Sequence, residues 1–490
     1  MSKVKKTANP GKLGRDLPKK GGAELRSTLG ESSFASALPE EKDRIIMDTS
    51  KLLEKVIDRN NLNLAYKRVK KNGGSHGVDG MKVDELLPYL KRHGDQIRHD
   101  LLEGKYRPQP VRRVEIPKPD GVGVRLLGVP TVIDRLLQQA IAQVLTQVYE
   151  KVFSDHSYGF RPGKSAQDAI KQAQVYINAG YTTVVDIDLE NFFDRVNHDK
   201  LMYLLSRRIL DKRLLRLLRR YLESGVMVGG LVSPSREGTP QGGPLSPMLS
   251  NVMLHELDKE LEKRGHRFCR YADDCNIYVK SQRAGERVMT SLTEFIEQRL
   301  KLKINRDKSA VDHVTQRKFL GFSYYRWQGG YRVRVDAKSV KRLKDKLRLL
   351  TSRSKGWSIG TRIYRLNQVI RGWVNYFSLA DMRNLCLRLD MWLRRRLRMC
   401  YWKQWKKVKT KHTNLVKLGI PRGKAWEFAN TRKSYWHTAN SWILARTLTN
   451  AYLGQIGFIN LVFVYDNLYL TNRRMPNGTY GGVRGQQKCL

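Results

Sequence analysis

The segment that most constrains this chain is Tyr271-Ala272-Asp273-Asp274, which sets two adjacent carboxylates between two short apolar and aromatic runs. The flanking runs predict a tight hairpin with this segment at its tip. Two anions a few ångströms apart in a half-buried turn repel each other unless a cation compensates them. Oxygen-only ligands favour magnesium, so the segment predicts a divalent-metal site, although a Tyr-x-Asp-Asp string alone is weak evidence.

A third carboxylate comes from residues 181–189, a β-branched run that predicts a buried strand ending in acid. Period-two alternation places Asp186 and Asp188 on one face and Val185 and Ile187 on the other. Either acid is a candidate metal ligand. The position at the end of the run favours Asp188 as the ligand and Asp186 as a capping or solvated strand-end residue.

Together, Asp188, Asp273 and Asp274 form a candidate catalytic set. A strand end and a hairpin tip can hold two metal ions about 4 Å apart, which is the arrangement used in phosphoryl transfer. One ion lowers the pKa of a primer 3′-hydroxyl, the other neutralises the departing pyrophosphate, and the protein mainly positions the reactants. The pattern therefore predicts polymerase chemistry.

The charge of the chain indicates a polyanionic partner. Its 490 residues, enough for roughly three domains, carry 92 Lys and Arg against 46 Asp and Glu, a net charge of +46. These cations are spread along the whole chain, which favours a long surface that tracks nucleic acid, with steep salt dependence. We expect no membrane partner, because no uninterrupted apolar span of about 18 residues and no lipidation motif is present. The N-terminus lacks the apolar core of a signal peptide, which predicts a cytoplasmic location.

The cysteines argue against zinc and disulfides. They form no Cys-x-x-Cys pair and no Cys/His cluster, so we expect neither a zinc site nor a disulfide framework. Buried thiols are the expected state of all five: Cys269, Cys275, Cys386, Cys400 and Cys489.

The last third of the chain has a different composition from the rest. All nine tryptophans lie at or beyond Trp327. Apolar side chains recur at steps of three and four in residues 363–377 and 385–400, and residues 338–347 suggest a further helix. We expect a three-helix bundle with basic outer faces suited to a nucleic-acid duplex, whereas the apolar stripes themselves form its core. Beyond Thr410, aromatic and basic residues interleave, which favours a small basic domain over direct base stacking.

Two loops are candidate nucleotide contacts. Residues 238–247 are a Gly/Pro-rich loop that opens a helix, and paired glycines allow close backbone approach to a ligand. A plain turn does not explain Gln241 in this loop, so we expect a contact with nucleotide and template. Residues 116–121, which include Lys118, predict a turn, and Arg125 follows on the return strand; two cations on adjoining strands can grip a triphosphate. Taken alone, these two cations are better explained as solvated.

Phe192 and Phe193 follow the strand that ends in Asp188. One ring can pack against the sugar of an incoming nucleotide and exclude a 2′-hydroxyl, and only one can, because neighbouring side chains point apart. A core position is the alternative for each ring.

The order and spacing of these motifs resemble the proteins encoded by bacterial group II introns, which combine reverse transcriptase and maturase activities. The resemblance covers nearly the whole chain after about residue 50. It is carried by residues 157–163 (Ser-Tyr-Gly-Phe-Arg-Pro-Gly), 188–194, 241–247, 271–274, 305–309, 319–322 and 372–377.

The resemblance implies roles for individual residues. Asp188 and Asp273 are expected to bind two catalytic Mg²⁺ ions, with the Leu189 carbonyl as a further ligand and Asp274 in support. Phe193 corresponds to the sugar-discriminating aromatic residue. The remaining expected contacts are Lys118 and Arg125 to the triphosphate, Gln241 and Gly242 to the nascent base pair, and Arg161 and Lys308 to nucleic acid.

The fold implied is α+β, a right-hand polymerase with fingers and palm around an antiparallel sheet. The expected order is a disordered basic arm (1–40), an N-terminal extension for RNA and template (41–110), fingers and palm (111–330), a helical thumb or maturase domain (331–410), and a DNA-binding region with tail (411–490). The implied partners are group II intron RNA, an RNA template with a DNA primer, and a DNA target, in intron splicing and mobility.

Two departures from the family pattern bear on function. Leu126 stands where the family often has proline or lysine. No Cys- and His-bearing endonuclease segment follows the last helical region, so we expect no target-strand cleavage and priming from another source, such as a nascent strand at a replication fork. The alternatives are a domesticated or defence-associated reverse transcriptase and an RNA-binding splicing factor; the three intact acids weigh against the latter.

Overall fold

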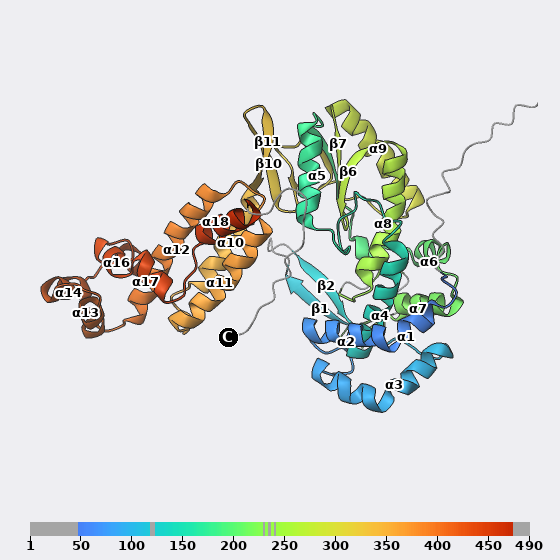
Figure 1. Ribbon diagram of the computed structural model, residues 1–490, viewed down its shortest axis with the longest axis horizontal. Coiled ribbons are helices and arrows are strands. Elements are labelled where there is room, and N and C mark those ends of the chain that lie inside the picture. The colour runs from blue at the N-terminus through green and yellow to red at the C-terminus, as the bar shows by residue number, and fades with distance from the viewer. Residues whose placement is uncertain (1–47, 118–122, 229–230, 234–236, 240–241, 474–490) are drawn as a thin grey trace, which may run out of the picture. The chain divides into compact units, whose positions relative to one another are not determined.

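The computed structural model describes residues 48–117, 123–228, 231–233, 237–239 and 242–473 (Figure 1). The predicted basic arm, residues 1–40, lies outside this part of the chain. So do Lys118 and Gln241, two of the expected nucleotide contacts.

The first described helices surround a helix that is buried on nearly all sides. This central helix, α4, begins after Thr131, whose hydroxyl accepts a hydrogen bond from the Asp134 N–H. Both α1 and α2 pack against α4, and an all-round apolar helix of this kind belongs in a core. The bounds are α1 Leu52–Ile57, α2 Arg59–Asn72, η2 Val83–Glu85, α3 Leu86–Leu102 and α4 Val132–Tyr149.

A four-stranded sheet of order β2-β1-β4-β5 follows, made of β1 Val111–Pro117, β2 Val124–Val129, β4 Val226–Val228 and β5 Leu231–Ser233. Its first two strands form the antiparallel hairpin predicted from the sequence, with Ile116 opposite Arg125. The turn of this hairpin falls outside the described residues. Arg125 therefore stands on the return strand, as expected.

A second four-stranded sheet, which we call the central sheet, has the order β6-β7-β3-β8 and is antiparallel throughout. Its strands are β3 Thr183–Ile187, β6 Arg267–Tyr271, β7 Asp274–Val279 and β8 Ala310–His313. The predicted hairpin is the β6–β7 pair, in which Tyr271 faces Asp274. The predicted strand ending in acid is β3.

The two faces of the central sheet belong to two apolar clusters. Val185 and Ile187 enter one cluster with residues of α8 and α9, and Val184 enters the other with residues of α5. This confirms the predicted alternation along β3. The helices here are α5 Ala166–Asn178, η3 Phe192–Asp194, α6 His198–Ser206, α7 Lys212–Glu223, α8 Ser246–Lys263 and α9 Gln282–Arg299.

The rest of the described chain is a short sheet followed by helices. The sheet comprises β9 Lys318–Phe319, β10 Phe322–Trp327 and β11 Gly330–Val335. The three predicted helices are present as α10 Ala337–Leu350, α11 Ile359–Tyr376 and α12 Arg383–Gln404. They are followed by α13 Val408–Lys417, α14 Arg422–Ala429, α15 Tyr435–Thr438, α16 Trp442–Thr447, α17 Asn450–Gln455 and α18 Leu461–Arg473.

One apolar cluster runs from α5 through α10, α11 and α12 to α18, so these helices share a core with the central sheet. None of the described helices combines the length and the apolarity needed to cross a bilayer. The mixture of antiparallel sheets with a helical C-terminal region agrees with the predicted α+β architecture. The domain boundaries at residues 330 and 410 stay predictions.

The start of α18 is capped by a side chain from another helix. Asp390, buried in the middle of α12, accepts hydrogen bonds from the backbone N–H groups of Leu461 (2.8 Å) and Val462 (2.9 Å). Burial raises the pKa of Asp390, whereas the two backbone bonds lower it. The carboxylate satisfies two of the N–H groups that a helix leaves without an internal partner at its N-terminus.

We expect Asp390→Ala to weaken the docking of α18 by about 1–2 kcal/mol, the usual cost of losing a helix cap. This corresponds to roughly 5- to 30-fold less protection of the first α18 amides in native-state hydrogen exchange. Asp345→Ala is the control, since Asp345 makes only an exposed ion pair with Arg348. Equal protection in the two variants would contradict the capping role.

Candidate active site

The strand register brings the predicted acids to one edge of the central sheet. Ile187 is the last paired residue of β3 and lies opposite Cys275, so Asp188 follows at the level of Asp274. Asp273 occupies the turn between β6 and β7. Burial raises the pKa of Asp188, the charge of Lys308 opposes this rise, and the charge of Asp273 adds to it. Asp188 therefore lies at the same edge of the sheet as the adjacent pair Asp273 and Asp274, which is distant from it in the sequence.

The turn that carries Asp273 has a backbone that few residues adopt. Ala272 has a φ of 57°, in the left-handed region, where a side chain costs energy. Gly159 packs directly against it: a Cβ on Gly159 would lie 2.3 Å from the Ala272 nitrogen. Only glycine fits there, so the segment around Gly159 fixes the position of the turn.

Arg270, just before the turn, is fully buried and uses all five of its N–H donors. It donates twice to Asp258 (2.6 Å from both Nε and Nη2), and also to Asn251 Oδ1 (3.1 Å), the Ala272 carbonyl (2.9 Å) and Ser157 Oγ (2.8 Å). A guanidinium has five donors, so none is left without a partner. The side chain thereby ties the turn to α8 and to the loop before α5.

This ion pair is completely removed from solvent, with 0% exposure of both side chains. Burial by itself lowers the pKa of Arg270, but the charge and the hydrogen bonds of Asp258 outweigh it and raise that pKa. A buried pair contributes little net stability against an apolar replacement, yet losing one partner is costly. We infer that its role is to fix the geometry of the turn.

Asp188 is held by the segment that precedes β8. Its N–H donates to Ser309 Oγ (3.0 Å), and its carbonyl accepts from the Asn305 N–H (2.9 Å). The Glu190 N–H donates to the Lys303 carbonyl (2.8 Å). The carbonyl of Leu189 takes no part in these bonds.

Asp186, the other acid on this face of β3, is paired within the protein. Arg317 donates to its Oδ2 from Nη2 (2.6 Å) and Nε (3.1 Å), and the same Nη2 donates to the Lys308 carbonyl (2.7 Å). A carboxylate bound in this way is not available as a metal ligand without losing the arginine. Asp186 thus has an arginine partner within the protein, whereas Asp188 follows β3 at the level of Asp274; the choice of Asp188 as the metal ligand stays a prediction.

The site concentrates negative charge. Asp274 is exposed and lines the cleft described below; desolvation by the surrounding protein, and then the charges of Asp273, Asp186 and Asp188, raise its pKa to about 7. Burial also raises the pKa of Asp188, and Lys308, with Nζ 3.8 Å from Asp188 Oδ1, opposes that rise. Acids whose charge is disfavoured in this way gain from a nearby cation.

The oxygen atoms of Asp188, Leu189 and Asp273 are the candidate ligands of a divalent cation. No three Asp, Glu, His or Cys side chains in the described part of the chain are gathered closely enough to hold an ion by themselves. The carboxylates of Asp188 and Asp273 with the carbonyl of Leu189 give two charged and one neutral oxygen donor. Oxygen donors suit Mg²⁺, which usually keeps water or phosphate oxygens as its other ligands. The residues therefore fit an ion that is completed by substrate.

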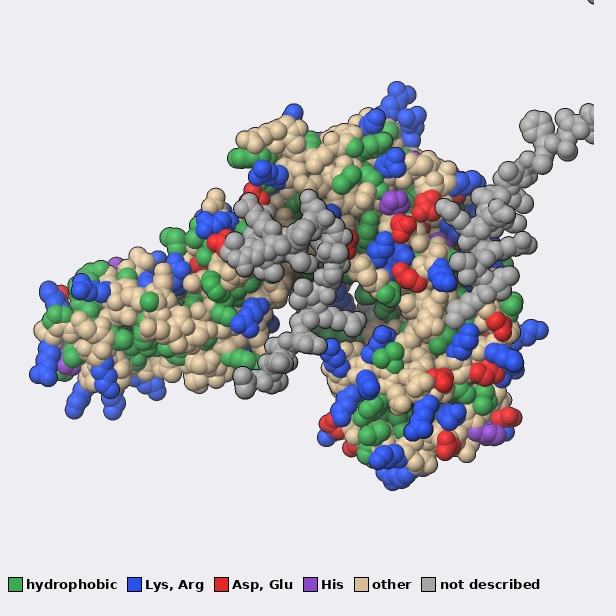
Figure 2. Space-filling model, viewed as in Figure 1, with side chains coloured by type: hydrophobic (Ala, Val, Ile, Leu, Met, Phe, Trp, Pro, Cys, Tyr) green, Lys and Arg blue, Asp and Glu red, His purple; other side chains and the backbone are tan. Residues whose placement is uncertain are grey.

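A cleft of about 1040 Å³ opens in front of the acids. Its walls come from three regions of the chain: Arg125 on β2, Asp188 and Asp274 in the central sheet, and Arg342 and Trp373 on α10 and α11. Figure 2 shows Lys and Arg side chains spread over the visible face and not confined to one end. Both acidic and basic side chains thus line the cleft.

Comparison with known proteins identifies the family. A model described as "Reverse transcriptase (RNA-dependent DNA polymerase)" matches residues 116–324, and one described as "Group II intron, maturase-specific domain" matches residues 340–419. Protein YkfC of Escherichia coli K12 is 35% identical over 281 residues, which are 49% of this chain and 74% of that protein. The chain belongs to the group II intron reverse transcriptase and maturase family.

A second relative agrees. The group II intron-encoded protein LtrA of Lactococcus lactis subsp. cremoris is 27% identical over 416 residues, 66% of this reverse transcriptase and 69% of LtrA. A solved structure titled "Partial Cas6-RT-Cas1--Cas2 complex" is 26% identical with a TM-score of 0.34 and covers 50% of this chain and 42% of that one. The chain is an RNA-directed DNA polymerase with a role in intron splicing and mobility, and its family generally uses a divalent metal for catalysis.

Of the expected nucleotide contacts of the reverse transcriptase, the structure describes Arg125, Phe193 and Gly242, and Arg125 is the one among these that lines the cleft. Arg125 is exposed. Phe193 is half-buried, whereas Phe192 is buried in the core, with the two ring centroids 5.2 Å apart. This leaves Phe193 as the ring that remains partly open to solvent. A Cβ on Gly242, whose φ is 117°, would lie 2.9 Å from the Gly128 carbonyl, so this glycine permits close approach of β2.

Of the two expected nucleic-acid contacts, one is exposed and one is internal. Lys308 is 63% exposed and lines the cleft beside Asp188. Arg161 is buried and donates from Nε (3.0 Å) and Nη2 (2.8 Å) to Glu150 Oε1, and from Nη1 to the carbonyls of Ser154 and Ser157. The structure thus corrects the expectation that Arg161 contacts nucleic acid. Its guanidinium is occupied by hydrogen bonds within the protein, which hold the loop before α5 in place.

Several supporting residues were not found from the sequence. Arg270 and Asp258, Ser309 and Arg317 all hold the acids in place, but none stands out in so basic a chain. The available signal was Arg270 itself, a charged residue within the apolar strand β6 and next to the turn, since such a residue needs a buried partner.

We expect Asp258→Ala to destabilise the reverse transcriptase by about 3–5 kcal/mol, because it leaves Arg270 buried without its counter-ion. The urea midpoint should fall accordingly, and adding Arg270→Met should recover part of the loss. Asp199→Ala, which breaks the exposed pair with Arg219, is the matched control and should cost less than about 1 kcal/mol. A wild-type midpoint for Asp258→Ala would overturn this account.

Proposed function

We propose that this reverse transcriptase extends a DNA primer on an RNA template with Asp188, Asp273 and Asp274 as its catalytic acids and two Mg²⁺ ions as cofactors. The observation that supports this most directly is the convergence of Asp188 with the β6–β7 turn at the floor of one large cleft. The raised pKa of Asp274, about 7, adds to it, because repelling carboxylates favour a bound cation.

In this proposal Asp188, Asp273 and the Leu189 carbonyl hold the metal. The bound ions would activate the primer 3′-hydroxyl and stabilise the charge of the leaving pyrophosphate. The protein fixes the ligands beforehand: Arg270 locks the turn that carries Asp273, and Ser309 locks the backbone of Asp188. Preorganised donors of this kind need not reorganise during the reaction.

The walls of the cleft would bind the incoming nucleotide. Arg125, with Lys118 on the same hairpin, would hold the triphosphate, and Gln241 with Gly242 would line the nascent base pair. Phe193 would pack against the sugar and exclude a 2′-hydroxyl. The exposed position of Arg125 on the cleft wall and the half-buried ring of Phe193 support these assignments.

The helical region would hold the template and primer. Cations on α10 reach the same cleft as the acids, namely Lys338, Arg342 and Lys346. We propose that residues 111–330 form fingers and palm, 331–410 the thumb or maturase domain, and 411–490 a region that contacts target DNA. Residues 41–110 would contact intron RNA and template. Their basic surfaces supply the phosphate contacts that such binding needs.

Primer extension on an RNA template with Mg²⁺ tests the chemistry. We expect Asp273→Ala to lower kcat by roughly 10³-fold or more, since it removes a charge at the centre of the transition-state electrostatics. Asp345→Ala, on the exposed face of α10, should leave kcat unchanged. Comparable cDNA yields from wild type and Asp273→Ala would refute the assignment.

Phe193→Ala should admit ribonucleotides, because the gap it leaves accepts a 2′-hydroxyl. We expect the ratio of kcat/KM for dNTP over rNTP to fall by at least about 10-fold, equivalent to roughly 1.4 kcal/mol. Phe192→Leu, a change within the core, is the control and should keep the wild-type ratio. Unchanged discrimination by Phe193→Ala would assign the role to another residue.

A further inference from the structure

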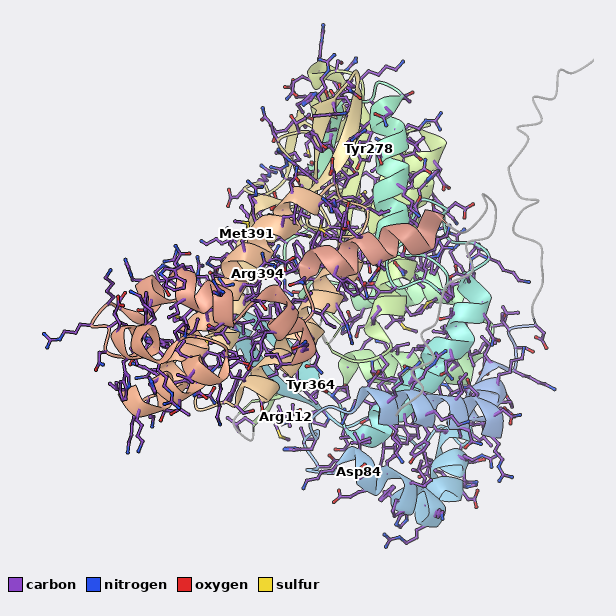
Figure 3. All side chains as sticks on the ribbon, turned by 60° about the vertical axis from the view of Figure 1, so that its left-hand side comes forward. Asp84, Arg112, Tyr278, Tyr364, Met391 and Arg394 are labelled. Atoms are coloured by element: carbon purple, nitrogen blue, oxygen red, sulfur yellow. The ribbon has the colours of Figure 1, made fainter. Side chains whose placement is uncertain are left out.

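A second concave site lies at the opposite end of the β6–β7 hairpin from the catalytic turn. β6 starts at Arg267 and reaches the turn at Tyr271, and β7 returns to Val279. A pocket of about 340 Å³ lies where these strands start and end, against α9. Figure 3 places Tyr278, one of its lining residues, on the central sheet and away from Tyr364 and Met391 on the helices α11 and α12.

The charged side chains that line this pocket are all cationic. Arg267, Lys280 and Arg287 come from three different elements, and His266 lies beside them. Within the described residues, no Asp or Glu oxygen lies within 4.0 Å of the three Lys and Arg side chains. Burial, and then the charge of Arg264, lower the pKa of His266, so this ring is neutral at pH 7.

This lack of counter-ions is local and does not simply follow from the high net charge. Another pocket, of about 400 Å³, at the other end of α9, has four cations in its wall, but two glutamates, Glu237 and Glu297, lie among them. Next to the cationic pocket, Arg264 is paired with Glu260 at 2.7 Å. Acidic side chains thus accompany the cations in that second pocket and at Arg264, whereas within the described residues none lies within 4.0 Å of the Lys and Arg side chains of this pocket.

An aromatic ring completes the pocket. Tyr181 precedes β3 and is half-buried, and Lys280 Nζ lies 5.4 Å from its ring centroid. Single-stranded nucleic acid is bound by this combination, in which cations follow the phosphates and an aromatic face takes a base. An acidic peptide would use the cations but need not carry an aromatic ring for Tyr181, whereas every nucleotide carries a planar base.

We propose that this pocket, formed by Tyr181, Arg267, Lys280 and Arg287, is a second RNA-binding site that holds a single-stranded segment outside the polymerase cleft. Arg267 and Arg287 contact adjacent phosphates, and a base rests against Tyr181. The inference rests on the proposed binding of intron RNA and adds to it a surface at the end of the β6–β7 hairpin opposite the catalytic turn. It leaves the chemistry of the cleft unchanged.

RNA binding to this pocket is measured while substrates occupy the polymerase cleft. The full chain is bound to a primer–template hybrid with a dideoxy-terminated primer and the next dNTP, and a fluorescent 20-nucleotide single-stranded RNA is then titrated by anisotropy at several salt concentrations. Each phosphate contact contributes about 0.7 to the slope of log K against log salt for single strands. Arg267→Gln/Arg287→Gln should therefore reduce the slope by about 1.4. Tyr181→Leu should weaken binding while it leaves the slope unchanged.

The matched control is Arg283→Gln/Arg299→Gln, which removes the same charge from exposed positions of α9 that do not line the pocket. It should keep the wild-type slope, and all variants should retain primer extension. Equal slopes in the two double variants would overturn the inference, as would displacement of the RNA by polyglutamate at equal charge concentration. Wild-type protein that fails to extend a primer would instead count against the proposed function.

Discussion

The buried pair of Arg270 and Asp258 is the interaction on which the catalytic geometry depends. The β6–β7 turn, which carries Asp273, is only two residues long and adopts a backbone that costs energy at Ala272. Arg270 compensates by binding the carbonyl of that same residue while Asp258 anchors the guanidinium to α8. Because every donor of the arginine is used, a shift of the turn would break several hydrogen bonds at once. Burying the two charges costs free energy, and the result is that the β6–β7 turn is held rigidly in one position.

A second constraint is the balance of charge around the acids. Four carboxylates gather near the end of β3, and the chain neutralises one of them permanently, since Arg317 binds Asp186. Lys308 approaches Asp188 without a hydrogen bond, at 3.8 Å, and is largely exposed. An exposed lysine can withdraw when a metal arrives, whereas the arginine bound to two groups stays. The site therefore separates a fixed counter-charge from a displaceable one.

The sequence predicted those features that follow from local periodicity. Alternation along residues 183–187 predicted which acids share a face, and the three- and four-residue spacing predicted α11 and α12, because both signals reside within one element. The roles of Arg270 and Arg161 depend on partners from other elements. In so basic a chain, the sequence does not distinguish an arginine that binds within the protein from one that binds nucleic acid. Arg161 was misjudged for that reason. Asp390 gave no signal either, since its donors lie 71 residues further on.

That last separation has a consequence for synthesis of the protein. While the ribosome makes the chain, Asp390 emerges long before Leu461 and Val462. During that time the carboxylate on α12 lacks the two backbone N–H groups of α18 that it binds in the folded protein. The maturase helices can complete their core only after the C-terminal segment has left the exit tunnel. A truncated or stalled product would expose the apolar cluster that α18 normally covers. The quality-control machinery of the cell would recognise such a product as incompletely folded.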